Sequence, residues 1–160
     1  MKESSSETTQ ARQRWLGQLA RAPRELLETS LAEVCQGAPL PAYTWLRAPQ
    51  TGLAMVRGRI GGTGDAFNMG EATLTRAVLR LKDADGAGPV GVAWQLGRDK
   101  RRAELAALAD AMLQSPRWGD AVRARLLAPL GATLDAARRA RAQDTATSRV
   151  DFYTMVRGES

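Results

Sequence analysis

The stretch EATLTRAVLRL, from Glu71 to Leu81, decides the fold class, because its side chains alternate with a period of two residues. One side of such a strand carries small and apolar residues, and the other side carries arginines. The first set is Thr75, Ala77, Leu79 and Leu81, and the second is Arg76 and Arg80. This alternation predicts a β-strand with one face against a core and the other toward solvent.

Further strands are predicted on both sides of this stretch. Tyr43 to Arg47 and Leu53 to Ile60 precede it, separated by a turn-like Pro49 to Gly52, and Val90 to Leu96 follows the turn-forming Asp83 to Pro89. The last strand has an apolar face that needs a cover, formed by Val90, Val92, Trp94 and Leu96. Short connections favour an antiparallel meander, so we expect a small antiparallel sheet of about four strands.

Helical periodicity appears before and after the strands. The helices predicted before the strands are Ala11 to Arg21 and a segment beginning at Pro23. Those predicted after the strands are Lys100 to Gln114, with Asp99 as its N-cap, and Leu134 to Gln143. The sequence therefore predicts an α+β fold in which N-terminal and C-terminal helices pack against the sheet.

The domain organisation follows from length and local composition. A chain of 160 residues is expected to form one domain. We assign residues 1–10 to a disordered N-terminal extension that does not resemble a signal peptide, 11–147 to a single α+β domain, and 148–160 to a C-terminal tail. Pro129 is expected to kink or break the helical stretch that begins at Trp118.

The composition excludes several kinds of catalytic site. The chain has no histidine and a single cysteine, Cys35, which excludes a Ser-His-Asp triad, a Cys-His pair and a histidine-based zinc site. No apolar run is long enough for a membrane span, and a cytoplasmic protein without bound metal is expected. The net charge is +6, but the arginines are scattered and aromatic residues make up only 5%, which disfavours nucleic-acid binding.

A glycine-rich segment between two predicted strands is the first candidate anion site. Closely spaced glycines expose backbone N–H groups, and arginines on the flanking strands add positive charge. The candidate residues are Arg59, Gly61, Gly62, Thr63, Gly64 and Asp65. The segment matches no phosphate-loop pattern, so a hairpin connection that needs glycine for its geometry alone is an alternative.

The turn Gly97-Arg98-Asp99-Lys100, where a strand enters a helix, is the second candidate. Arg98 and Lys100 beside a helix N-terminus would favour an anion. The alternative is a capped helix with solvated charges, because the Asp99 carboxylate would occupy the same N–H groups.

The C-terminal tail combines apolar and charged residues in a short segment, which suggests a contact with a partner protein. The candidate contact residues are Arg149, Asp151, Phe152, Tyr153, Met155 and Arg157. Packing of the tail against its own domain is the alternative.

Three blocks of the chain closely resemble the PhnG family, a subunit of the bacterial carbon–phosphorus lyase core complex. They are RIGGTGDAFNMGEATLTRAVLRL (Arg59 to Leu81), LGRDKRRAELAALADAMLQ (Leu96 to Gln114) and SRVDFYTMVRG (Ser148 to Gly158). Gln13 to Trp15 and Arg47 to Leu53 also fit, so the resemblance covers nearly the whole chain.

The resemblance implies a subunit of α-D-ribose 1-methylphosphonate 5-triphosphate synthase, a transferase complex in which methylphosphonate displaces adenine from MgATP. It implies PhnI, PhnH and PhnJ as partners, with PhnL and PhnK as accessory ATPase-like proteins. It assigns no catalytic residue and no bound cofactor to this chain, which is expected to be inactive alone. Two other classes remain open, a self-sufficient transfer enzyme and a basic nucleic-acid-binding module.

Overall fold

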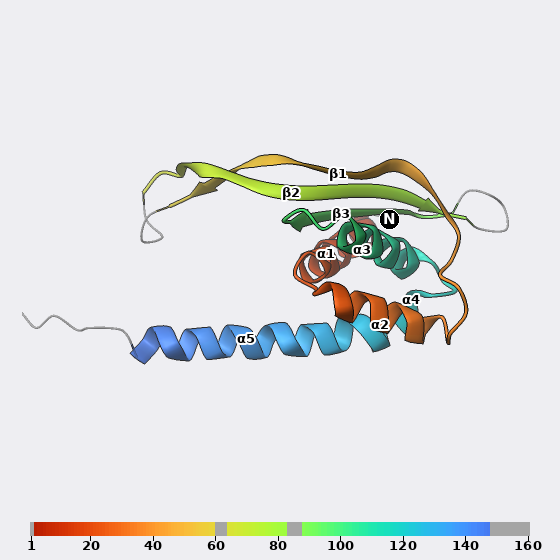
Figure 1. Cartoon of the computed structure of the whole chain (residues 1–160). Coiled ribbons are helices and arrows are strands. Elements are labelled where there is room, and N and C mark those ends of the chain that lie inside the picture. The colour runs from red at the N-terminus through yellow and green to blue at the C-terminus, as the bar shows by residue number, and fades with distance from the viewer. Residues whose placement is uncertain (1, 60–63, 83–87, 148–160) are drawn as a thin grey trace, which may run out of the picture.

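The computed structural model describes residues 2–59, 64–82 and 88–147 and shows an α+β fold (Figure 1). Three strands, β1 (Tyr43–Gly58), β2 (Phe67–Leu81) and β3 (Val90–Leu96), form an antiparallel sheet in the order β1-β2-β3. All helices lie on one side of this sheet. The predicted fold class is confirmed, with three strands in place of about four.

The strand count differs because β1 is a single strand across the expected turn at Pro49 to Gly52. The pairing of β1 with β2 shifts register between Trp45 and Arg47 and again between Arg47 and Gln50. These bulges take up the extra residues, and Pro49 is tolerated because β1 is an edge strand. The chain therefore continues in one direction where its local composition predicts a reversal.

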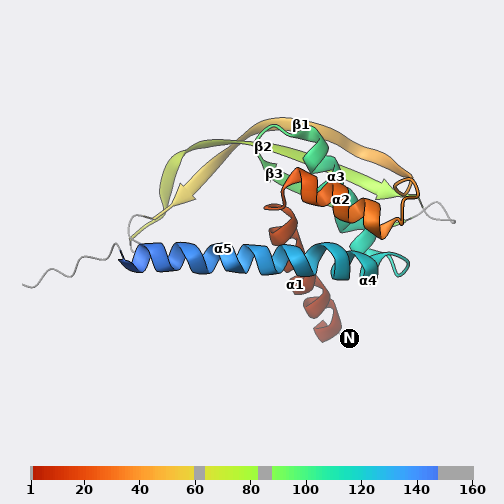
Figure 2. The ribbon, with the colours of Figure 1, turned by 60° about the horizontal axis from the view of Figure 1, so that its bottom comes forward.

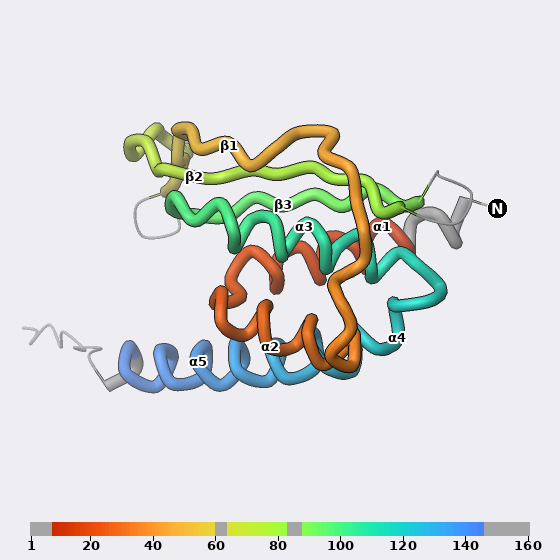
Figure 3. The backbone as a smooth tube through the Cα atoms, turned by 45° about the vertical axis from the view of Figure 1, so that its right-hand side comes forward, coloured from red at the N-terminus to blue at the C-terminus, as the bar shows by residue number. Residues whose placement is uncertain are grey.

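The helices stack in two layers beneath the sheet, with α1 and α3 next to it and α2 and α5 further away (Figure 3). Their bounds are α1 Lys2–Leu19, α2 Arg24–Val34, α3 Lys100–Gln114, α4 Gly119–Val122, a π-helical turn η2 Arg123–Leu127, and α5 Ala128–Thr147. Among the described residues, no helix is both long enough and apolar enough to cross a membrane.

Two helices extend further than the sequence indicates. Helix α1 begins at Lys2, so it includes most of the segment 1–10 that we assigned to a disordered extension. Once a helix has formed, each added residue contributes a further backbone hydrogen bond, so polar residues without an apolar stripe can continue it. The helix that we expected over Leu134 to Gln143 spans Ala128–Thr147.

The helical chain continues through Pro129, and a π-helical turn directly before this proline is the irregularity found there in place of a break. The π-helical turn η2 immediately precedes α5, and the Ala128 N–H donates to the Arg123 carbonyl, five residues back. A proline lacks an N–H group and its ring crowds the carbonyl four residues earlier. The wider π turn fits this local irregularity, and α5 continues as a long helix that crosses α1 (Figure 2).

The core surrounds α3, which packs between the sheet and the other helices. Leu105, Leu108 and Met112 of α3 are fully buried, as are Ala77 and Leu79 of β2. The Asp99 side chain accepts a hydrogen bond from the Arg102 N–H at 2.9 Å, which confirms the predicted N-cap of α3. Helix α3 therefore begins and ends at the predicted residues.

A buried carboxylate joins α1, α3 and β3. Asp110 is fully buried in α3 and accepts hydrogen bonds from the Trp15 Nε1 at 2.8 Å and from the Val92 backbone N–H at 2.9 Å. Arg12 forms an ion pair with Asp110 at 2.8 Å and also donates to the Val90 carbonyl at 3.0 Å. These side chains satisfy backbone groups of β3 on its outer edge, where no further strand pairs.

The Tyr43 side chain links β1 to α3, and this contact predicts a pH-dependent stability. Its hydroxyl donates to Glu104 at 2.6 Å, and burial, together with this carboxylate, raises the pKa of Tyr43 to about 12. Because the folded pKa exceeds the ordinary value near 10, the contribution of Tyr43 to stability is complete below pH 10 and is lost as the pH rises through 12. Urea unfolding of the wild type should show this loss, and Tyr43→Phe should remove that part of the pH dependence. An unchanged pH profile in Tyr43→Phe would contradict the assignment.

Candidate functional site

The sheet has one face without a covering layer in the described part of the chain. Paired positions in an antiparallel sheet point to the same side, and the pairs Gly52↔Leu74, Leu74↔Leu96 and Arg76↔Trp94 link the three strands. These side chains lie opposite the helices, which all sit on the other face (Figure 1). We call this surface the open sheet face; it comprises Thr44, Arg47, Gln50, Gly52, Ala54, Val56, Gly70, Ala72, Leu74, Arg76, Val78, Arg80, Val90, Val92, Trp94 and Leu96.

Large apolar side chains on the open sheet face are accessible to solvent. Trp94 is 56% exposed and Leu96 is 69% exposed, and both belong to β3. The Arg76 guanidinium lies 5.9 Å from the centre of the Trp94 ring, within the range of a cation–π contact. A hollow of about 270 Å³ opens here, lined by residues 50–54 of β1, by Leu74 and Arg76 of β2, and by Trp94.

This arrangement corrects our interpretation of β3. We expected Val90, Val92, Trp94 and Leu96 to form an apolar face that helices cover. The structure instead turns the intervening residues, Gly91, Ala93 and Gln95, toward the helices and buries them. The reason is distance: a Cβ atom on Gly91 would lie 1.9 Å from the Ala107 carbonyl oxygen, so only the smallest residue fits there.

A second exposed surface is the hairpin arm, formed by residues 52–58 of β1 and 67–74 of β2, which projects beyond α1 and α3 (Figures 1 and 3). Leu53, Met55, Phe67 and Met69 are between 44% and 65% exposed on it. Register shifts by one residue near its end, between Val56 and Arg57. Contiguous exposed apolar residues of this kind mark surfaces that bind other macromolecules.

The structure describes only part of the predicted glycine-rich anion site. Gly61, Gly62 and Thr63 lie outside the described residues, whereas Arg59, Gly64 and Asp65 are described and exposed. Gly64 has a φ of +79°, a conformation that favours glycine. Arg57 beside it donates to the Ala66 carbonyl at 3.0 Å, so this arginine supports the backbone at the end of the hairpin. Anion binding by the loop stays a prediction.

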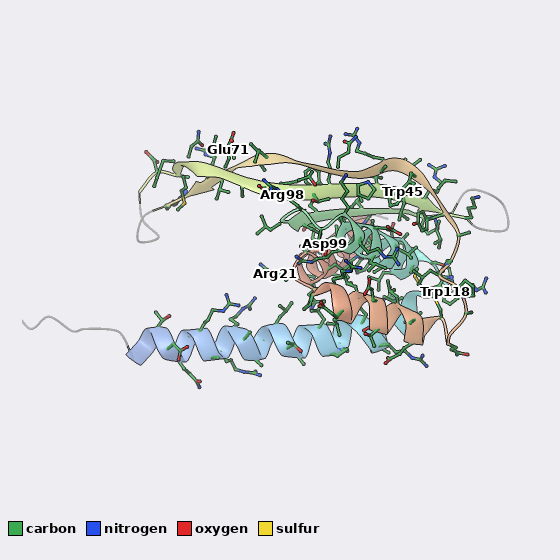
Figure 4. The ribbon with its side chains drawn as sticks, in the orientation of Figure 1. Arg21, Trp45, Glu71, Arg98, Asp99 and Trp118 are labelled. Carbon is green, nitrogen blue, oxygen red and sulfur yellow. The ribbon has the colours of Figure 1, made fainter. Side chains whose placement is uncertain are left out.

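At the second predicted anion site, the Asp99 carboxylate occupies the N–H group of Arg102 as a cap, and Arg98 and Lys100 are exposed. The occupied N–H group favours the alternative of a capped helix with solvated charges, and anion binding at this turn stays a prediction. Glu71 stands on the hairpin arm, whereas Arg98 and Asp99 lie at the junction of β3 and α3 (Figure 4).

The two predicted anion sites are far apart along the sheet. The Gly97 N–H donates to the Thr73 carbonyl, which places the second site beside the middle of β2. The glycine-rich segment joins β2 at Phe67, and the intervening strand is about 20 Å long at the usual rise per residue. The described residues of the first site, Arg59, Gly64 and Asp65, therefore do not join Arg98 and Lys100 in one site.

The described residues include no group of three or more His, Cys, Asp or Glu side chains that could hold a metal ion. The Cys35 thiol is buried, and burial raises its pKa, which opposes a role as a nucleophile. Asp65 and Glu71, the acids nearest the glycine-rich segment, are exposed. The predicted partner-contacting residues of the tail, Arg149 to Arg157, lie outside the described residues.

Sequence reasoning missed the open sheet face and the Asp110 network. A signal for the first was present, because Gly91, Ala93 and Gln95 alternate with larger residues and small residues allow a helix to approach closely. No spacing rule indicates the Asp110 network, because Asp110 is 98 residues from Arg12 and 95 residues from Trp15 along the chain.

Comparison with known proteins agrees with the resemblance seen in the sequence. A family model described as phosphonate metabolism protein PhnG matches residues 10–158. A protein of Rhizobium meliloti (strain 1021), named alpha-D-ribose 1-methylphosphonate 5-triphosphate synthase subunit PhnG, is 52% identical over 119 residues. This match covers 74% of the present chain and 73% of the relative. The chain belongs to the PhnG family of phosphonate metabolism proteins.

Proposed function

We propose that this chain is a non-catalytic subunit of a complex in which methylphosphonate displaces adenine from MgATP, giving ribose 1-methylphosphonate 5-triphosphate. The observation that carries the proposal is family membership, since the Rhizobium meliloti relative is named as a subunit of that synthase. The open sheet face and the hairpin arm support it, because both expose apolar side chains that a partner would bury.

The chemistry of the chain fits a supporting role. Both substrates and the product are polyanions, for which arginine side chains and exposed N–H groups are suitable donors. Departure of adenine calls for a general acid; the chain has no histidine, and the acids nearest the glycine-rich segment, Asp65 and Glu71, are exposed. Cleavage of the carbon–phosphorus bond by an iron–sulfur cluster needs several cysteine ligands, whereas this chain has one cysteine. We therefore assign the catalytic groups to other subunits.

The partners in this proposal are PhnI, PhnH and PhnJ, with PhnL and PhnK as accessory ATPase-like proteins. The reaction takes place in the cytoplasm, where MgATP is available as the substrate. This chain binds no cofactor by itself and supplies a surface, and at most anion-binding groups, to a site on its partners.

Reconstitution tests the proposal directly. The chain is co-expressed with the partner subunits, the complex is purified, and adenine release from MgATP and methylphosphonate is measured with this chain present or omitted. We expect a stable complex whose adenine release requires this chain. Full adenine release without the chain, or a chain that co-purifies with no partner, would overturn the proposal. Adenine release by the purified chain alone would establish a self-sufficient enzyme instead.

A basic nucleic-acid-binding module is the second candidate function. The specific observation in its favour is the pairing of Arg76 with the exposed ring of Trp94, because such pairs also bind single strands. It predicts tight binding to an oligonucleotide that weakens steeply with added salt.

Arg59→Ala tests whether the glycine-rich segment reaches the site of the reaction. Arg59 is exposed next to that segment, so its removal should leave the fold and the assembly intact. If the segment supports polyanion binding in the transition state, we expect adenine release to fall by about 100-fold. Arg138→Ala, at an exposed position on α5, is the matched control and should retain activity. Wild-type activity of Arg59→Ala in an intact complex would remove the segment from the site.

A further inference from the structure

We propose that the open sheet face binds a segment of a partner subunit that presents acidic residues around one apolar side chain, which enters the hollow beside Trp94. This inference rests on the proposed function, and it adds the surface and the chemistry of the contact. The hollow measures about 270 Å³, and residues 50–54, Leu74, Arg76 and Trp94 line it.

The apolar part of the face is the first argument. Trp94 and Leu96 are 56% and 69% exposed, and Val56 on β1 is 42% exposed. Burial of a tryptophan removes a large apolar area from water, and tryptophan with arginine is enriched at the centres of protein interfaces. Gly52 contributes no side chain, so the hollow remains open between β1 and β3 for a side chain of the partner.

The charge of the face is the second argument and determines the chemistry of the partner. Arg47, Arg76 and Arg80 lie on the open sheet face, and no acidic residue does. In the described part of the chain, ion pairs involve other arginines, and these three form none with a described carboxylate. Their guanidinium groups can therefore receive carboxylates from outside the chain.

The same charges disfavour other occupants. A second copy in a two-fold contact would present the same face, which places arginines opposite arginines without a carboxylate between them. A nucleic acid strand would supply negative charge, but strand-binding sheets stack successive bases on several aromatic rings. The open sheet face offers Trp94 as its aromatic side chain, so an acidic protein segment is the better match.

Two variants test the surface without disturbing the core. Gly52→Leu fills the hollow, and nothing lies within 4 Å of a Cβ atom at Gly52, so the fold can accept the side chain. Arg76→Glu reverses the charge beside Trp94. Arg138→Glu makes the same charge change at an exposed position of α5, on the helical side of the molecule, and serves as the control.

Binding of each purified variant to the partner subunits PhnI, PhnH and PhnJ is measured by co-purification and by titration, with a thermal midpoint for each chain. We expect Gly52→Leu and Arg76→Glu to bind at least about ten-fold more weakly at an unchanged midpoint, and Arg138→Glu to bind like the wild type. Wild-type affinity of both face variants overturns the proposed surface while leaving the proposed function intact. Failure of the wild-type chain to bind any partner overturns the proposed function. Oligonucleotide binding is measured on the same variants, and if the face variants lose only this binding, the face belongs to a nucleic-acid site and the proposed surface is overturned.

Discussion

Gly91→Ala should lower the free energy of unfolding by at least about 3 kcal/mol or prevent folding. Gly91 is buried in β3 directly above α3, where an added Cβ would lie 1.9 Å from the Ala107 carbonyl oxygen and 2.8 Å from the Ala111 nitrogen. Both atoms belong to the helix backbone, so no side-chain rotation can relieve the clash. Strand and helix must move apart, which opens the core around Leu108 and Met112. Urea unfolding followed by circular dichroism measures the change.

Two other glycines of the sheet provide graded controls for this substitution. Nothing lies within 4 Å of a Cβ atom at Gly52, so Gly52→Ala should change stability by less than about 1 kcal/mol. At Gly58 the nearest atom is the Met69 sulfur, at the flexible end of a side chain, so Gly58→Ala should have an intermediate effect. Unfolding of Gly91→Ala at the same urea concentration as Gly52→Ala would contradict the close packing of β3 against α3.

Asp110→Ala should cost about 3–5 kcal/mol of stability, because it leaves buried polar groups without a partner. The Asp110 carboxylate accepts from Trp15 and from the Val92 backbone, and it neutralises Arg12. Its removal leaves two buried N–H groups unpaired and exposes the edge of β3. Equilibrium unfolding in urea gives the loss, and the tryptophan fluorescence should report a changed environment of Trp15.

Asp120→Ala is the matched control for Asp110→Ala. The Asp120 side chain is 99% exposed and forms an ion pair with Arg123, so its removal should produce no measurable change in stability. Asp110→Asn retains one oxygen acceptor but loses the charge, and it should fall between the wild type and Asp110→Ala. Equal stability of Asp110→Ala and Asp120→Ala would show that the buried network contributes nothing.

Much of the secondary structure could be predicted from local sequence. The bounds of β3 and α3 agree with the predictions, because each element has a clear repeat and a defined start or stop, such as the Asp99 cap. The prediction failed at Pro49, and at Pro129 the helical chain continues after a π-helical turn instead of breaking. At Pro49 the fold requires no N–H group, because β1 is an edge strand. At Pro129 the preceding turn has adapted to the proline. Local sequence rules contain neither piece of information.

The candidate site was less predictable than the fold. The glycine-rich segment, the turn at Gly97 and the tail were predicted from the blocks of sequence that resemble the family. The structure separates the described residues of the first two along β2. The open sheet face emerged from the pairing of three strands, because Gly52, Arg76 and Trp94 become neighbours only when the sheet is assembled.

The amino-acid sequence by itself determined that consecutive strands lie between N-terminal and C-terminal helices, that the chain lacks histidine-based chemistry, and which family it belongs to. Tertiary structure alone decided which face of β3 is buried. The periodicity of Val90 to Leu96 is the same for either face, and hydrophobicity favours burial of Val92, Trp94 and Leu96. Close packing of α3 against Gly91 and Ala93 reverses that preference, because the tight contact between a helix and a strand admits only small side chains. The larger residues are left on the open sheet face.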